Sequence, residues 1–213
     1  TGDYTLVVDA KTISPCMGKA TIAIEDKDFY KHGGISASGI ARAFISNSQG
    51  NAVQGGSTLT QQLVKKVFFT KDEAMQRGLS GIPRKIKEMI LAIEVERMYS
   101  KDQILGLYLN ESPYGGRRNG VESAAQTYFG KSSKDLTLPE CSLLAAIPNN
   151  PSLYNPYNTY GRKALVERQH KVLDDMVSMN YISKQEAAAA KKVDIMDTIK
   201  PLADQYANVK APH

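Results

Sequence analysis

Two glutamates stand in unusually apolar stretches of this sequence. Glu25 directly follows the run Ala20–Ile24, and Glu88 has Leu91, Ala92 and Val95 as its helical neighbours at i+3, i+4 and i+7. A carboxylate in apolar surroundings is either paired with a cation or made more basic by burial, and a basic carboxylate suits general-base catalysis. A pair of carboxylates is typical of glycosidic-bond chemistry.

The residues after Glu25 extend the first candidate site. Glu25, Phe29 and His32 are spaced i, i+4 and i+7, a spacing that predicts one face of a helix, with Asp26 beside them. Two other interpretations stay open. Glu25 and Asp26 form an exposed acidic pair at a helix end, or His32 caps a helix before Gly33 and Gly34.

A second group follows the glycine pair Gly55-Gly56. Glycines allow close backbone approach, and Ser57 is predicted to cap a helix that continues to about Phe69. The spacing predicts a row of hydroxyl, amide and ammonium groups on that helix, which suits phosphate or sugar oxygens: Thr58, Gln62 and Lys65. The alternative is an amphipathic helix with a solvated face. A Walker P-loop is excluded because the glycine–lysine order is wrong.

Cations also accompany Glu88. Arg84 precedes it by one helical turn and Lys85 lies between them, on a helix predicted from Pro83 to Tyr99 whose opposite side carries an apolar stripe, Ile86, Met89, Ile90 and Ile93. This pattern predicts that Glu88 lines a cleft. A simple Arg84–Glu88 salt bridge, worth a few tenths of a kcal/mol, is the alternative. Added cations favour a phosphorylated substrate, so the residues alone indicate a sugar or phosphate enzyme.

The elements around these residues are mostly helical. Helix-start patterns predict further helices over 36–45, 102–109, 138–147, 162–179 and 184–192, the second, third and fifth of them opened by capping boxes at Ser100, Thr137 and Ser183. Tyr4–Ala10 is the one predicted strand, and Lys71–Ser80 is predicted to be a polar loop. The predicted fold class is mainly α.

Composition limits the possible classes of protein. The 213 residues fit one domain, or one domain built as two lobes, and 42% hydrophobic with 23% charged residues excludes a disordered chain. A net charge of +5 suits an anionic ligand or a membrane surface and is too small to indicate nucleic-acid binding. The two cysteines, Cys16 and Cys141, are interpreted as small core residues, and no ligand spacing for zinc is present.

Several motifs, in order, resemble the family 51 glycosyltransferases, the peptidoglycan polymerases of bacterial cell-wall synthesis. They are Glu25-Asp26-x-x-Phe29-x-x-His32-x-Gly34, Gly55-Gly56-Ser57-Thr58-Leu59-Thr60-Gln61-Gln62 followed by Lys65, Arg84-Lys85-x-x-Glu88-x-x-x-Ala92-x-x-x-Glu96, and Ser100-Lys101-x-x-Ile104-Leu105-x-x-Tyr108-Leu109-Asn110. Residues 138–156 and 168–176 resemble the later motifs. The resemblance implies a lysozyme-like helical domain over 1–213, with two lobes and a central cleft.

The resemblance also implies a reaction and a set of site residues. Glu25 is expected to act as general base on the GlcNAc 4-hydroxyl of lipid II, inverting C1 of the lipid-linked MurNAc and releasing polyprenyl pyrophosphate. Glu88 is expected to assist at the pyrophosphate, by placing a divalent cation (Mg or Mn) or the neighbouring cations; no organic cofactor is expected. The substrate-binding residues implied are Asp26, Phe29, His32, Gly56, Ser57, Thr58, Gln61, Gln62, Lys65, Arg84 and Lys85.

Partners and location follow from the same resemblance. Lipid II, the growing glycan strand and moenomycin-type inhibitors are the expected ligands, and no nucleic acid is expected. Residues 66–83 are expected to be a mobile, membrane-facing segment of the small lobe. Residues 201–213 are expected to start a linker to a transpeptidase domain of a bifunctional class A penicillin-binding protein, and a monofunctional parent is the lesser alternative. The expected location is the extracytoplasmic face of the bacterial membrane, with the anchor outside this chain.

Two other functions compete with polymerisation. A muramidase-type hydrolase shares the fold and a catalytic glutamate, but it does not need the cations Lys65, Arg84 and Lys85. A non-catalytic module for anionic lipid or nucleic acid is suggested by the basic charge, and the motif glutamates argue against it.

Overall fold

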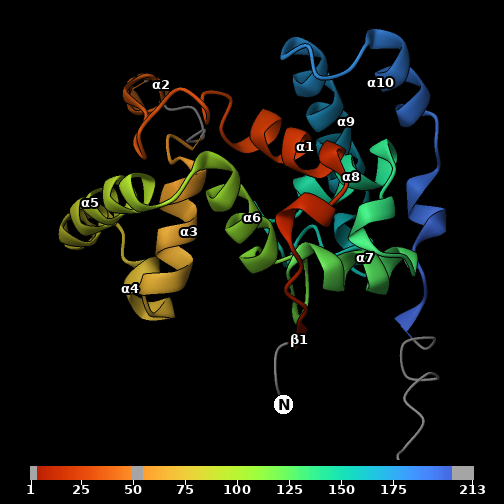
Figure 1. The fold of residues 1–213 in the computed structure, drawn as a ribbon, viewed down its shortest axis with the longest axis horizontal. Helices are drawn as coiled ribbons and strands as arrows, with labels where there is room; N and C mark the ends of the chain where they lie inside the picture. Colours follow the sequence, from red (N-terminus) through yellow and green to blue (C-terminus); the bar gives the residue numbers. More distant parts are fainter. Residues whose placement is uncertain (1–3, 49–54, 203–213) are drawn as a thin grey trace, which may run out of the picture. The chain divides into compact units, whose positions relative to one another are not determined.

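The structure, a computed structural model, describes residues 4–48 and 55–202, and these are mainly helical (Figure 1). The chain forms two compact units: unit 1 holds the residues up to Ile24 and from Leu109 onwards, and unit 2 holds Glu25–Tyr108. The chain crosses between the units inside two helices, α1 (Pro15–Glu25) and α6 (Lys101–Glu111). The predicted helical class and the two lobes are thus confirmed.

Unit 2 contains all the predicted site residues. Its helices are α2 (Ala37–Ser48), α3 (Leu59–Phe68), α4 (Lys71–Met75), α5 (Ile82–Met98) and the first part of α6, with a 3₁₀ turn over Gly78–Gly81. Helix α3 packs against α5. The buried apolar side chains of the two helices are small or branched: Leu59, Leu63, Val64 and Ala92.

Unit 1 is built around α8 (Leu138–Ala146), whose apolar side chains from Cys141 onwards are buried. Helix α9 (Arg162–Ser178) packs against α8, and α10 (Lys184–Lys191) contacts both α8 and α9. Helix α7 (Val121–Phe129) follows a two-residue strand, β2 (Arg118–Asn119), which pairs in parallel with β1 (Tyr4–Thr5). Short 3₁₀ turns lie at Ala10–Thr12, Ser133–Asp135, Thr159–Gly161 and Ile195–Thr198.

The two cysteines form a disulfide, so the interpretation of both as plain core residues is wrong. Cys16 in α1 is bonded to Cys141 in α8, across 125 positions of sequence. Cys141 is fully buried, as expected, and Cys16 is half-buried. Two cysteines so far apart carry no spacing signal, because their pairing depends on how α1 packs in unit 1.

Most predicted helices are confirmed, and three local predictions are wrong. The strand expected over Tyr4–Ala10 is only Tyr4–Thr5, because the chain turns into a 3₁₀ helix capped by Asp9. Helix α3 is capped by Thr58 rather than Ser57. The polar loop predicted over Lys71–Ser80 contains α4, which begins with a capping box between Thr70 and Glu73.

Two further expectations concern a membrane-spanning helix and the linker at the end of the chain. Among the described residues, no helix has the length and apolar character needed to cross a bilayer. The predicted linker over 201–213 lies almost entirely outside the described residues, which end at residue 202.

Candidate active site

Glu25 is the last residue of α1, where its carboxylate meets side chains of two other helices. Gln62 of α3 donates from Nε2 to Glu25 Oε2 at 3.3 Å. The hydroxyl of Tyr108, in α6, donates to Gln62 Oε1 at 3.2 Å. Glu25 is half-buried, so its carboxylate is partly accessible to solvent. The Gln62 amide orients this carboxylate, and the Tyr108 hydroxyl orients the amide.

Asp26 and His32 hold the turn that follows α1. Asp26 Oδ2 accepts from the backbone N–H of Leu59 at 3.0 Å and lies 2.6 Å from His32 Nε2. The backbone N–H of Gly34 donates to His32 Nδ1 at 3.1 Å. The expectation that Glu25, Phe29 and His32 share one helix face is wrong, because the chain leaves the helix at Asp26 and the turn is fixed by these contacts instead.

Phe29 and a buried carboxylate complete this turn. The ring of Phe29 is fully buried, and Lys101 Nζ lies 4.6 Å from its centroid. Lys101 Nζ also donates to Glu96 Oε1 at 2.8 Å and to the carbonyl of His32 at 2.6 Å. Glu96 accepts a further bond from Thr60 Oγ1 at 2.7 Å. These contacts join the turn to α3, α5 and α6 and make it a firm support for Glu25.

The start of α3 is fixed by its own capping box. Thr58 accepts from the N–H of Gln61, and the Gln61 side chain accepts from the N–H of Thr58. The Thr58 hydroxyl also donates to the carbonyl of Gly34 at 2.7 Å. Thr58 and Gln61 are buried, whereas Gly56 and Ser57 are half-buried. Binding of substrate by these four residues stays a prediction; the structure shows what orients them.

Glu88 is buried and paired with two cations of its own helix. The side chain is almost fully enclosed, at 1% exposure for the residue. Arg84 Nη1 donates to Glu88 Oε2, and Lys85 Nζ donates to Oε1 at 2.7 Å. Lys85 Nζ also donates to Ser57 Oγ at 2.8 Å, so the group extends from α5 to the start of α3. The salt bridge considered from the sequence is present, and it belongs to a larger cluster.

Lys65 of α3 adds a further positive charge to this cluster. Burial lowers the pKa of Lys65 below the ordinary lysine value, and the positive charges of Arg77, Lys85 and Arg84 lower it further. The Glu88 carboxylate acts in the opposite direction and raises the pKa. A cation held near other cations by a single carboxylate is poised to receive an anion, because an anion relieves their mutual repulsion.

The described residues near Glu88 do not fit a divalent cation. Mg²⁺ and Mn²⁺ prefer several oxygen ligands, with carboxylates foremost. Both oxygens of Glu88 already accept from Arg84 and Lys85. Within residues 4–48 and 55–202 no group of three or more acidic, histidine or cysteine side chains is arranged to hold a metal. No chemical step is therefore derived through a metal near Glu88, and the divalent cation implied by the resemblance stays an untested prediction.

Helix α3 connects the two glutamates. Gln62 of α3 contacts Glu25, and Lys65 of α3 interacts electrostatically with Glu88. Ser57, which lies just before the N-cap of α3, contacts Lys85. Helix α3 thus contacts both a carboxylate that could accept a proton, Glu25, and a cluster of cations that would attract an anion. This combination suits the transfer of a sugar from a phosphorylated donor.

Three residues at the site received no role from the sequence. Tyr108, Glu96 and Lys101 lie inside quoted motifs, yet their spacing gave no reason to connect them with Glu25 or His32. Apart from the bond between Lys101 and Glu96, their hydrogen bonds link residues 36 to 69 positions apart in the sequence, such as Thr60 with Glu96 and Lys101 with His32. Helical periodicity carries no signal at that range.

Comparison with known proteins shows a clear similarity. A protein-family model described as "Transglycosylase" matches residues 2–177. Penicillin-binding protein 1A of Haemophilus influenzae is 46% identical over 178 residues, 83% of this chain and 20% of that protein. Penicillin-binding protein 1A of Aquifex aeolicus is 44% identical over 168 residues, 78% of this chain and 22% of that protein. The chain thus spans about a fifth of the length of these curated relatives.

A solved structure agrees with the sequence comparison. The crystal structure of penicillin-binding protein 1A from Haemophilus influenzae matches with a TM-score of 0.52 and 27% identity, covering 90% of this chain and 18% of that one. The lysozyme-like helical fold expected from the sequence is confirmed. The central cleft stays a prediction.

Proposed function

Because the chain belongs to the transglycosylase family, we propose that it polymerises lipid II into β-1,4-linked glycan strands of peptidoglycan, at the extracytoplasmic face of a bacterial membrane. The observation that carries the proposal is the joining, through α3, of a partly accessible carboxylate to a buried carboxylate–cation cluster. The first supplies a proton acceptor, and the second receives a charged leaving group.

In the proposed reaction Glu25 removes the proton from the 4-hydroxyl of the acceptor GlcNAc. The hydroxyl oxygen attacks C1 of the lipid-linked MurNAc, and the new O4–C1 bond forms as the bond from C1 to the phosphate oxygen breaks. The electron pair of the broken bond leaves with the polyprenyl pyrophosphate. Attack from the opposite face inverts C1, which requires an acceptor and a leaving group on opposite sides of the sugar.

The cations act on the leaving group. Lys65, Arg84 and Lys85 bind the pyrophosphate oxygens and neutralise the charge that develops as the bond breaks, so the phosphate departs without being protonated. Glu88 orients Arg84 and Lys85 through its two oxygens, which is the support already visible in their contacts. The divalent cation remains a separate prediction that a chelator titration of the polymerisation rate tests.

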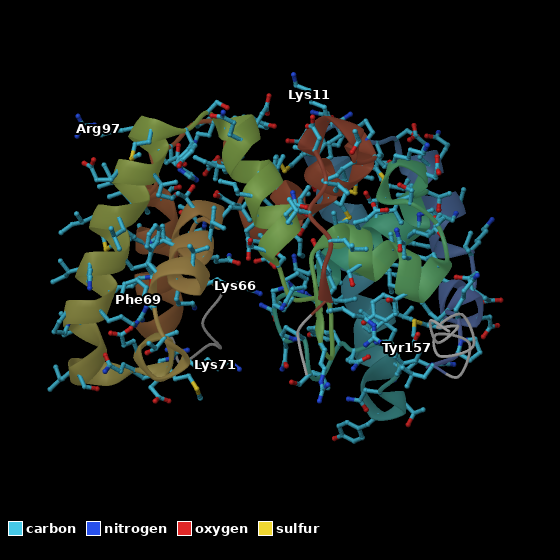
Figure 2. All side chains as sticks on the ribbon, turned by 60° about the horizontal axis from the view of Figure 1, so that its bottom comes forward. Lys11, Lys66, Phe69, Lys71, Arg97 and Tyr157 are labelled. Atoms are coloured by element: carbon cyan, nitrogen blue, oxygen red, sulfur yellow. A yellow bond between two sulfur atoms is a disulfide. The ribbon has the colours of Figure 1, made fainter. Side chains whose placement is uncertain are left out.

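A lipid-linked substrate also needs a surface that meets the membrane. On α5, Ile82, Ile86, Ile90 and Ile93 recur at helical spacing and are exposed. Further exposed apolar side chains precede α5 in unit 2: Phe68, Met75 and Leu79. Exposed lysines lie in the same segments of the sequence: Lys66 near the end of α3 and Lys71 at the start of α4, both labelled in Figure 2, and Lys87 in α5. Exposed apolar side chains and lysines suit an anionic lipid surface, and we propose membrane contact for residues 66–83 and for the exposed isoleucines of α5.

Vesicle binding tests the membrane surface. Replacing Ile86 and Ile90 together by serine removes exposed apolar area without opening the core, so binding to vesicles of anionic phospholipid should weaken about tenfold. Val193→Ser, which changes an exposed residue of unit 1, is the control and should bind like the unchanged chain. Equal binding by both variants would remove the assignment.

Polymerisation itself is tested with labelled lipid II in detergent. The unchanged chain should produce glycan strands, and Glu25→Gln should lower the rate at least about 100-fold, because the amide cannot accept the proton. The control is Glu94→Gln, on an exposed side chain of α5 paired with Arg97, and it should polymerise normally. A normal rate for Glu25→Gln in a folded protein would show that the base is another group.

Two partner assignments belong to the same proposal. Moenomycin-type phosphoglycolipids should compete for the cation cluster, since they present a phosphate and sugars as the donor does. A transpeptidase domain in the parent protein is proposed from the similarity to penicillin-binding proteins, of which this chain covers about a fifth. The first assignment is tested by asking whether a moenomycin-type phosphoglycolipid lowers the rate of lipid II polymerisation by this chain.

A further inference from the structure

Three side chains from three helices form a linear hydrogen-bonded chain that ends on the base. Tyr108 of α6 donates to the Gln62 amide oxygen at 3.2 Å, and the Gln62 amide nitrogen donates to Glu25 Oε2 at 3.3 Å. Tyr108 is 4% exposed, so its ring is fixed by packing and its hydroxyl has little freedom to move. Gln62 and Glu25 are half-buried.

The direction of these bonds follows from the charge at one end. An ionised carboxylate only accepts hydrogen bonds, so the Gln62 amide must turn its NH₂ group toward Glu25. The amide oxygen then faces Tyr108, and the phenol must donate to it. Each bond polarises the next in such a chain, so the phenol strengthens the hold of the amide on the carboxylate.

The three hydrogen-bonded side chains also connect two distant points of the sequence. Glu25 and Tyr108 are the first and last residues of unit 2, at the two places where the chain crosses between the units. Gln62 connects them from α3. A base at the end of its helix needs such an anchor, because rate depends steeply on the placement of the reacting groups.

We propose that Tyr108 is a positioning residue for the base: through the Gln62 amide it holds the Glu25 carboxylate in the orientation that accepts the acceptor's proton. The inference rests on the proposed polymerisation of lipid II, and it assigns Gln62 to the base in addition to any contact with substrate. A positioning role predicts an effect on turnover and not on binding.

Tyr108→Phe tests the role directly, because it keeps the buried ring and removes only the hydroxyl. In lipid II polymerisation by the 213-residue chain, kcat should fall about tenfold while KM stays within about twofold. Tyr160→Phe, which removes the hydroxyl of a residue that is 90% exposed in unit 1, should leave both constants unchanged. An unchanged kcat for Tyr108→Phe, or a rise in KM alone, would overturn the proposal.

A double-mutant cycle separates positioning through Gln62 from a general structural effect. Gln62→Met removes the amide and keeps the side-chain length, so it should lower kcat at least as much as Tyr108→Phe does. Adding Tyr108→Phe to that variant should then cause no further loss, since the phenol has nothing left to act through. Losses that multiply would show that Tyr108 acts independently of Gln62 and would contradict the inference.

Thermal unfolding accompanies the kinetics. If Tyr108→Phe does not fold, Gln62→Met decides alone: its kcat must fall, and a normal kcat overturns the proposal. Failure of the inference is distinguishable from failure of the proposed function. Without polymer from the unchanged chain the function itself falls, whereas equal polymerisation by the unchanged chain and Tyr108→Phe removes only the positioning role.

Discussion

Lys65 shows how the environment of one residue sets its chemistry. Burial takes its ammonium group partly out of water, and Arg77, Lys85 and Arg84 add repulsion, so its pKa lies below that of an ordinary lysine. Glu88 offsets part of this effect by its negative charge. The residue therefore loses its proton at a lower pH than an ordinary lysine does, and the cluster loses one of its positive charges with it.

The pH dependence of polymerisation follows from this direction. On the alkaline side the rate should decline as Lys65 deprotonates, and Lys65→Arg should move that decline to higher pH because arginine keeps its charge. Lys66→Arg, at the exposed neighbouring position, should leave the profile unchanged. The measurement is the polymerisation rate from neutral to alkaline pH. Identical alkaline limbs for Lys65→Arg and the unchanged chain would show that Lys65 does not contact the leaving group.

The burial of Glu88 and its pairing with cations of its own helix were predictable from the sequence, and the contacts between different helices were not. The apolar neighbours of Glu88 correctly indicated burial, and Arg84 was correctly placed beside it. The contact of Lys85 with Ser57 and that of Gln62 with Glu25 join different helices. Such contacts depend on how the helices pack, which one sequence read for periodicity does not specify.

At the scale of elements, the turn between α1 and α2 packs closely on α5. Gly34 has a φ of +105°, and a Cβ there would lie 2.7 Å from the backbone oxygen of Ala92. Only glycine fits this combination of backbone conformation and close approach. The turn carries Asp26 and His32, so its fit against α5 also fixes the residues that follow Glu25.

Gly34→Ala should therefore destabilise the protein strongly. Strain at positive φ and the clash with Ala92 together should lower the free energy of unfolding by about 3 kcal/mol or more. Gly33→Ala is a matched control, because a Cβ at Gly33 meets nothing within 4 Å, and it should change stability by less than about 1 kcal/mol. Denaturant titration of both variants checks this. Equal stability would mean that the turn does not pack on α5 as described.

Helices with local start signals were the most predictable elements. Helix α8 begins with the capping box of Thr137 and Glu140, and α5 begins at Ile82–Pro83, close to the predicted starts. The end of α1 was not predictable, because the residues after Glu25 keep helical spacing and leave the helix only through tertiary contacts such as Asp26 with Leu59. Local pattern and tertiary contact conflict there, beside the proposed base.

At the scale of the whole molecule, the disulfide is the covalent link that ties the start of the chain to residues far along it. Cys16 and Cys141 enclose 125 positions, a span that includes all of unit 2. Such a link restricts the unfolded chain far more than the folded one. Its loss should therefore lower stability even though both cysteines belong to unit 1.

Reduction tests this contribution. The pair Cys16→Ser and Cys141→Ala, or reductant added to the unchanged chain, should lower the free energy of unfolding by about 2 to 4 kcal/mol. Reductant should have no effect on the double variant, which controls for other actions of the reagent. Unchanged unfolding under reductant, with free thiols demonstrated by labelling, would contradict the account of the disulfide as a stabilising link.

The proposed activity differs from hydrolysis in what is released. Transfer from a lipid pyrophosphate liberates one polyprenyl pyrophosphate for each new glycosidic bond, whereas a muramidase-type hydrolase liberates reducing ends from existing strands. The presence of Lys65, Arg84 and Lys85 around Glu88 favours the first, since a hydrolase has no pyrophosphate to neutralise.

The most direct test counts both products of one reaction. With purified lipid II, phosphorus NMR measures the polyprenyl pyrophosphate released, and proton NMR measures the β-1,4 linkages formed. We predict equal amounts of the two, both lost together in Glu25→Gln. Reducing ends released from preformed strands with no lipid II consumed would contradict the account.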